Sequence, residues 1–170
     1  MKKVLAIMAV LLAVTSCVEK QAQAPNNEPK TKLEQYADSI KKAYPNYAGN
    51  DAINKLICED FEKRMLELPG ILEDNPFHII EGVMEVGGTY HLMLSAEGDI
   101  SLSVWDENLA KETALKLDKT KLYKVTGGEV EKYEPAHSHG GNILYLGSIY
   151  VKNIQLEEIP GSHYESPIGN

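Results

Sequence analysis

A strict alternation of aliphatic residues with serine or tryptophan at positions 100–105 is the feature of this sequence that most constrains its fold. Side chains along a β-strand point alternately to the two faces of a sheet. The apolar members of the run are Ile100, Leu102 and Val104, and its other members are Ser101, Ser103 and Trp105. A shift of one residue would bring the serines into the core, so we expect the three apolar side chains to point inward from a half-buried strand.

Two similar runs precede this strand in the sequence. The segments at 77–86 and 90–96 are rich in β-branched and aromatic residues, and Gly87-Gly88 separates them. Glu97-Gly98 separates the second run from a third at 99–105. The sequence therefore predicts three consecutive strands joined by tight turns.

The rest of the chain up to residue 160 continues this pattern. Apolar residues at helical intervals over 107–117 predict a short helix. Runs typical of β-strands resume at 122–133 and 142–159. Gly127-Gly128 predicts a bulge or bend inside the first of these two strands. Gly147-Ser148 indicates a break in the second.

Two helices are expected before the strands. Thr31 and Glu34 have the spacing of a capping box, and apolar residues at helical intervals follow as far as Tyr44. A second helical pattern covers 52–68 and stops at Pro69-Gly70. The fold class predicted is α+β and mostly β.

The element order also resembles a known family. From Pro76 to Ile159, about half of the chain, the sequence is similar to the OB-fold domains of bacterial exported proteins grouped as tRNA-anticodon-binding-like. The stretches that carry the likeness are Ile80–Met84, Ile100–Val104, Leu117–Thr120, Leu122–Gly127 and Leu144–Leu146. The resemblance implies a five-stranded OB-like β-barrel with N-terminal helices and a short helix between strands 3 and 4.

The N-terminus has the pattern of an export signal. Lys2 and Lys3 precede an apolar run of eleven residues at 4–14, which is too short to span a membrane. The small residues that follow end at Cys17 and resemble a lipobox, so we expect Cys17 to carry lipid. The lipid would anchor the protein to a membrane of the bacterial cell envelope, with its domain in the periplasm or exposed at the surface. The alternative is an ordinary secretory signal that contains a cysteine. The expected division is a signal at 1–16, a tether at 17–30, a helical region at 31–70, the barrel at 71–160 and a loose tail at 161–170.

The net charge and the cysteine count exclude two classes of interaction, nucleic-acid binding and a disulfide within the chain. Removing residues 1–16 takes away two lysines and no acid, which leaves 15 basic and 25 acidic residues and a net charge of −10. Nucleic-acid binders need clustered Lys and Arg, so we expect no nucleic-acid partner. With Cys17 acylated, Cys58 has no disulfide partner within the chain and is expected to be a small buried apolar residue.

Two groups of residues are candidate sites. Tyr90, His91 and Trp105 would offer stacking surfaces on strands two and three, the face that OB folds use for ligands. Oligonucleotide-binding members also carry basic residues on this face, whereas this sequence has serines and nearby acids there.

The second candidate is a metal site in the loop before the last strand. His137 and His139 could turn toward one divalent ion, with Glu134 or the distant His163 as a third ligand. The alternative reading is a pair of solvated histidines in a glycine-rich turn.

No catalytic motif appears in the sequence: there is no nucleophile elbow, zinc-protease helix, phosphate loop or dinucleotide fingerprint. We therefore expect a non-enzymatic binding or assembly module without a cofactor, whose partner is a protein or a small molecule. A metal-dependent envelope enzyme that uses His137 and His139 is the alternative. A structural role within a larger envelope complex is a third reading.

Overall fold

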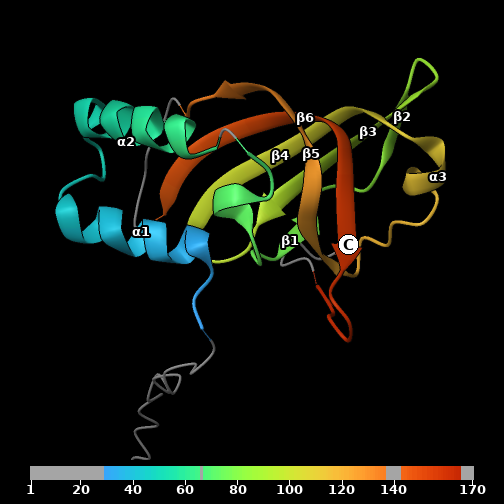
Figure 1. Ribbon diagram of the computed structural model, residues 1–170, viewed down its shortest axis with the longest axis horizontal. Helices are drawn as coiled ribbons and strands as arrows, with labels where there is room; N and C mark the ends of the chain where they lie inside the picture. Colours follow the sequence, from blue (N-terminus) through green and yellow to red (C-terminus); the bar gives the residue numbers. More distant parts are fainter. Residues whose placement is uncertain (1–28, 66, 137–142, 166–170) are drawn as a thin grey trace, which may run out of the picture.

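The computed structural model describes residues 29–65, 67–136 and 143–165 (Figure 1). Helix α1 covers Lys32–Ala43, and α2 covers Asp51–Arg64. Thr31 caps α1: its side chain accepts from the backbone N–H of Glu34, and the Glu34 carboxylate accepts from the N–H of Thr31. This confirms the predicted capping box. Within the described residues, no helix is long and apolar enough to cross a bilayer.

The two helices pack together at one end of the molecule, opposite the end formed by β2 and α3 (Figure 1). The Tyr36 hydroxyl of α1 donates to the backbone carbonyl of Ile57 in α2 at 3.2 Å. The ring of Phe61 lies 5.8 Å from the ring of Tyr36 and also 5.8 Å from that of Tyr133 on β5. This aromatic chain connects both helices to the sheet.

Six strands form one mixed sheet. They are β1 (Phe77–Ile79), β2 (Met84–Val86), β3 (Thr89–Ala96), β4 (Ile100–Leu109), β5 (Leu122–Glu134) and β6 (Leu144–Glu158). Their order is β1-β5-β6-β4-β3-β2, and β1 also pairs with β3, so five strands form a closed ring of pairings. Strands β4 and β6 run parallel, and all other pairs are antiparallel. The predicted α+β, mostly β class is confirmed.

The first predicted strand is in fact two. Positive φ angles at Glu81 (58°) and Gly82 (92°) break the extended backbone between β1 and β2. Both short strands still pair with β3, through Ile79 opposite Leu94 and Met84 opposite His91. A positive φ is unusual for a residue with a side chain, which is why the break at Glu81 was not predicted.

The predicted helix at 107–117 was too long. Strand β4 continues to Leu109, where it pairs with Tyr90, and α3 covers only Lys111–Ala114. The buried carboxylate of Asp106 holds this extension, because it accepts from the backbone N–H of Asn108 at 2.8 Å and from that of Ile154 on β6 at 3.1 Å. A short 3-10 turn, η1 (Gly70–Leu72), also follows α2.

The sequence predicted a bulge at Gly127-Gly128 and a break at Gly147-Ser148, and only the bulge is present. Register shifts on both sides of Gly127 confirm the bulge in β5. At Gly147 the strand does not break, and β6 runs through it with φ at 105°. A Cβ at position 147 would overlap the backbone carbonyl oxygen of Glu134, so this glycine lets the end of β5 lie close against β6.

The core lies inside the ring and beneath the helices. Ile100, Leu102 and Val104 are buried there, as the alternation predicted. The segment after β6 also packs on the sheet. The backbone N–H of Tyr164 donates to Thr120, and the Tyr164 ring stacks on His78 at 4.1 Å. The remainder of the predicted tail, 166–170, lies outside the described residues.

Candidate functional site

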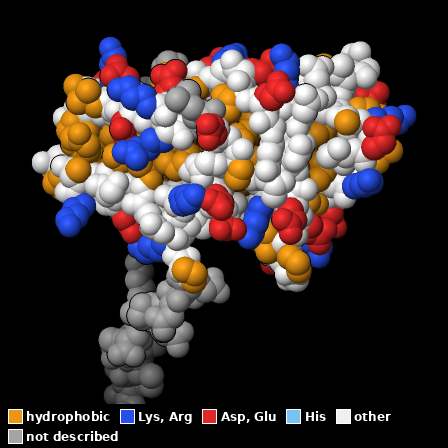
Figure 2. Space-filling model, viewed as in Figure 1, with side chains coloured by type: hydrophobic (Ala, Val, Ile, Leu, Met, Phe, Trp, Pro, Cys, Tyr) orange, Lys and Arg blue, Asp and Glu red, His pale blue; other side chains and the backbone are white. Residues whose placement is uncertain are grey.

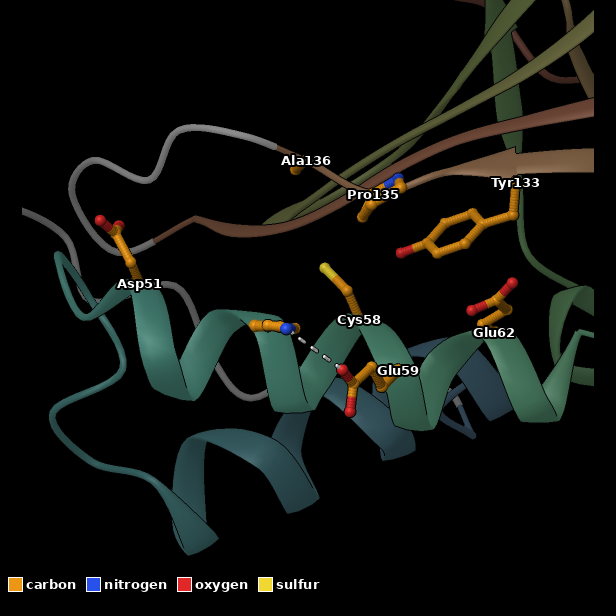
Figure 3. Close-up of a pocket in the computed structure, with 8 residues that line it drawn as sticks. Asp51, Cys58, Glu59, Glu62, Tyr133, Pro135 and Ala136 are labelled. Carbon is orange, nitrogen blue, oxygen red and sulfur yellow. Dashed lines mark ion pairs between the residues drawn. The ribbon is translucent and has the colours of Figure 1, made fainter.

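A cavity of about 490 Å³ lies between α2 and the end of β5 (Figure 3). We call it the α2–β5 pocket. Its lining residues are Asp51, Lys55, Cys58, Glu59 and Glu62 from α2, and Tyr133, Pro135 and Ala136 from β5 and the residues that follow it. The volume falls in the range of small-molecule sites in proteins.

The floor of the pocket is formed by a thiol and a phenol. Cys58 is 4% exposed, and its Sγ lies 3.9 Å from the backbone carbonyl oxygen of Leu146. The Tyr133 hydroxyl donates to the same oxygen. Figure 3 shows the Cys58 thiol rising from α2 and the Tyr133 hydroxyl reaching toward it from β5.

The environment keeps the phenol neutral. Burial is the main cause that raises the pKa of Tyr133 above its ordinary value, and a hydrogen bond with Cys58 adds to it. A neutral hydroxyl that donates to a backbone carbonyl is not placed to abstract a proton. None of the eight lining residues is a histidine that could activate the thiol.

The rim of the pocket is acidic. Asp51, Glu59 and Glu62 are exposed carboxylates, and Lys55 is the one basic residue that the described part of the chain contributes to the lining. Lys55 Nζ lies 4.0 Å from the Glu59 carboxylate. The described lining thus has three negative charges and one positive charge around a floor of Cys58 and Tyr133 and a wall of Pro135 and Ala136. This arrangement favours a ligand that has an apolar body and a cationic group.

Trp105 lies on the outward face of β4. Its ring stacks on that of Tyr150 in β6, with centroids 6.0 Å apart and planes inclined by 16°. His91 lies two residues along β3 from Met93, the strand partner of Trp105. Tyr90 packs against the core instead. The structure therefore gathers part of the predicted stacking group on one face, but not Tyr90.

The predicted metal site falls largely outside the described residues, which do not include His137 or His139. Glu134 is described, and its carboxylate accepts from Lys132 at 2.7 Å and from the Tyr150 hydroxyl at 3.0 Å. His163 lies 3.5 Å from Glu165. Across 29–65, 67–136 and 143–165, no group of three or more His, Cys, Asp or Glu side chains is arranged to hold a metal ion.

The sequence reasoning missed the α2–β5 pocket. A signal was present, because Asp51, Lys55, Cys58 and Glu62 recur at intervals of three or four residues and so share one face of α2. Cys58 was predicted to be buried, and it is, but its thiol also forms part of a cavity floor.

Comparison with known proteins adds nothing to this geometry. No family model, no curated protein and no solved structure matches the chain. The functional conclusion therefore depends on the residues alone.

Proposed function

We propose that this chain is a non-enzymatic binding module of the bacterial cell envelope, held to a membrane by lipid on Cys17, whose α2–β5 pocket takes a small organic cation. The anchor part of the proposal rests on the pattern of residues 1–17: a basic start, a short apolar run and small residues before the cysteine.

The proposed architecture is an OB-like barrel. Counting β1 and β2 as one interrupted strand gives five strands, the number in an OB fold. The ring of pairings through β1 and the position of α3 between β4 and β5 in the chain support this interpretation.

The acidic rim of the α2–β5 pocket is the observation that supports a cationic ligand. Exposed carboxylates at Asp51, Glu59 and Glu62 attract a cation, and the floor beneath them offers apolar surface to the rest of the molecule. Basic side chains elsewhere are interspersed with acidic ones over the face drawn in Figure 2. That distribution does not favour a polyanionic partner such as nucleic acid.

A pair of matched probes tests the proposal. Hexylammonium and heptanoate have the same six-carbon alkyl chain and opposite charges, so calorimetric titration of the full chain with each separates charge recognition from apolar burial. We expect hexylammonium to bind about fivefold more tightly than heptanoate, since an exposed ion pair contributes up to roughly 1 kcal/mol and the acidic rim also repels the carboxylate.

Two variants localise the binding. Glu62→Gln removes one rim charge and should weaken hexylammonium binding by about twofold to fivefold. Glu85→Gln removes an exposed acid from β2, at the other end of the molecule, and should leave binding unchanged. Equal affinity for the two probes, or an equal effect of the two variants, would contradict the proposed ligand class.

A further inference from the structure

Outward side chains of four neighbouring strands form a continuous row across the sheet. Met93 on β3 is the strand partner of Trp105 on β4, Trp105 is the partner of Tyr150 on β6, and Tyr150 is the partner of Lys132 on β5. We call these four residues the aromatic row. The three interstrand steps span roughly 14 Å at the usual strand spacing of about 4.8 Å.

A second row runs parallel to the first, two residues along each strand. Ser95 on β3 faces Ser103 on β4, Ser103 faces Ser148 on β6, and Ser148 faces Glu134 on β5. We call these residues the serine row. All three serines are half-buried, so short hydroxyl side chains lie along the edge of the larger aromatic row.

The aromatic row is held in a fixed orientation. Trp105 and Tyr150 are stacked, and Lys132 Nζ lies 4.1 Å from the centroid of the Tyr150 ring. The carboxylate of Glu134 accepts from both Tyr150 and Lys132. These contacts orient the rings before any ligand arrives, which reduces the entropic cost of binding.

Charge on this surface is balanced. Lys132 and Glu134 form an ion pair at 2.7 Å, and the remaining members of the two rows are uncharged. A polyanion would lack the clustered cations that it needs. Serine hydroxyls both donate and accept hydrogen bonds, and a carboxylate accepts them, so the surface matches a neutral ligand with many hydroxyl groups.

We propose that the aromatic and serine rows bind a neutral oligosaccharide chain. The C–H groups of successive sugar rings would pack against the parts of Trp105 and Tyr150 that their mutual stack and the Lys132 contact leave exposed, while the sugar hydroxyls would bond to the serine row. The length of the rows fits a short oligosaccharide rather than a single sugar.

This surface is separate from the α2–β5 pocket. Tyr133 and Glu134 are successive residues of β5, so their side chains point to opposite faces. The Tyr133 hydroxyl lies in the pocket, whereas the Glu134 carboxylate contacts Tyr150 in the aromatic row. The inference therefore goes beyond the proposed function and does not depend on it.

The chain supplies its own probe for the test. Trp105 is the one tryptophan in the sequence, so intrinsic tryptophan fluorescence reports on this surface alone. We would titrate the full chain in detergent with N,N′,N″-triacetylchitotriose and with cellotriose, which are both neutral, and repeat each titration by calorimetry. At least one trisaccharide should bind and change the emission of Trp105.

Variants on each row then assign the site. Tyr150→Ala removes half of the stacked pair, and Ser103→Leu places a bulky apolar side chain in the serine row; each should weaken binding by roughly tenfold, a loss comparable to that of one aromatic contact. Leu115→Ser, an exposed position just after α3, is the matched control and should leave affinity unchanged. Circular dichroism would verify that each variant is folded.

Three results would overturn the proposal: no heat and no fluorescence change with either sugar, unchanged affinity in both row variants, or displacement of the sugar by an oligothymidylate. Hexylammonium binding tests the two sites separately, and it should be unchanged in the Tyr150→Ala protein. If the parent protein binds hexylammonium but neither sugar, the oligosaccharide proposal fails and the pocket proposal stands.

Discussion

The thiol of Cys58 and the hydroxyl of Tyr133 converge on one acceptor, the backbone carbonyl oxygen of Leu146. The three residues belong to α2, β5 and β6, so this small cluster fixes the helix against the sheet. It also forms the floor of the α2–β5 pocket, which connects the stability of the helix–sheet contact to the shape of the site.

Tyr133→Phe removes the stronger of these two donors and keeps the ring. We expect the free energy of unfolding to fall by about 1 kcal/mol, the usual net contribution of one hydrogen bond, because the ring still packs on Phe61. Urea denaturation measures the change. Tyr164→Phe, which keeps the ring that stacks on His78, is the control and should change stability by less than about 0.5 kcal/mol.

Alkaline pH should destabilise the fold. Burial raises the pKa of Tyr36 and Tyr133 above the ordinary value, so the unfolded chain loses these two protons at lower pH than the folded chain does. The unfolded state then binds fewer protons above about pH 10, and stability falls as pH rises through that value. Denaturation midpoints between pH 8 and pH 11 would show the decline, and the Tyr133→Phe protein should show a smaller one.

Loss of the buried carboxylate of Asp106 should lower the free energy of unfolding more than the other substitutions proposed here. It is 1% exposed and accepts from two backbone N–H groups, those of Asn108 and Ile154. Asp106→Ala leaves both donors without this partner, so we expect a loss of roughly 2–4 kcal/mol in the free energy of unfolding. Glu107→Ala, at the exposed neighbouring position, should remain within about 0.5 kcal/mol of the parent protein. Similar losses in the two variants would mean that the Asp106 contacts do not hold the extension of β4.

Cys17→Ala tests the anchor. If Cys17 carries lipid, the parent protein should sediment with membranes and the variant should appear in the soluble fraction of lysed cells. Cys58→Ala is the matched control, because it removes the other cysteine of the chain and should leave the protein with the membranes. A Cys17→Ala protein that remains with the membranes would contradict the lipid assignment.

Local patterns predicted the local structure well. The alternation at 100–105 identified the buried face of β4, and the spacing of Thr31 and Glu34 identified the start of α1, because strand alternation and helix capping are properties of neighbouring residues. The break at Glu81 was missed because a positive φ is unusual for a glutamate and no local sequence pattern signals it.

The candidate sites depend on contacts that the sequence does not encode locally. Cys58 and Tyr133 are distant in the chain and meet because α2 packs on the end of β5. The aromatic row likewise depends on the parallel pairing of β4 with β6, which brings Trp105 beside Tyr150. Sequence reasoning selected Trp105 but could not name its strand partner.

The most direct test of the proposed binding function is to locate hexylammonium on the protein by nuclear Overhauser effects. In the expected result, its methylene protons show cross-peaks to the side chains of Cys58, Tyr133 and Pro135, which line the floor and wall of the α2–β5 pocket. Cross-peaks to Trp105 and Tyr150 instead, or none to any pocket residue under conditions in which calorimetry detects binding, would contradict the pocket as the ligand site.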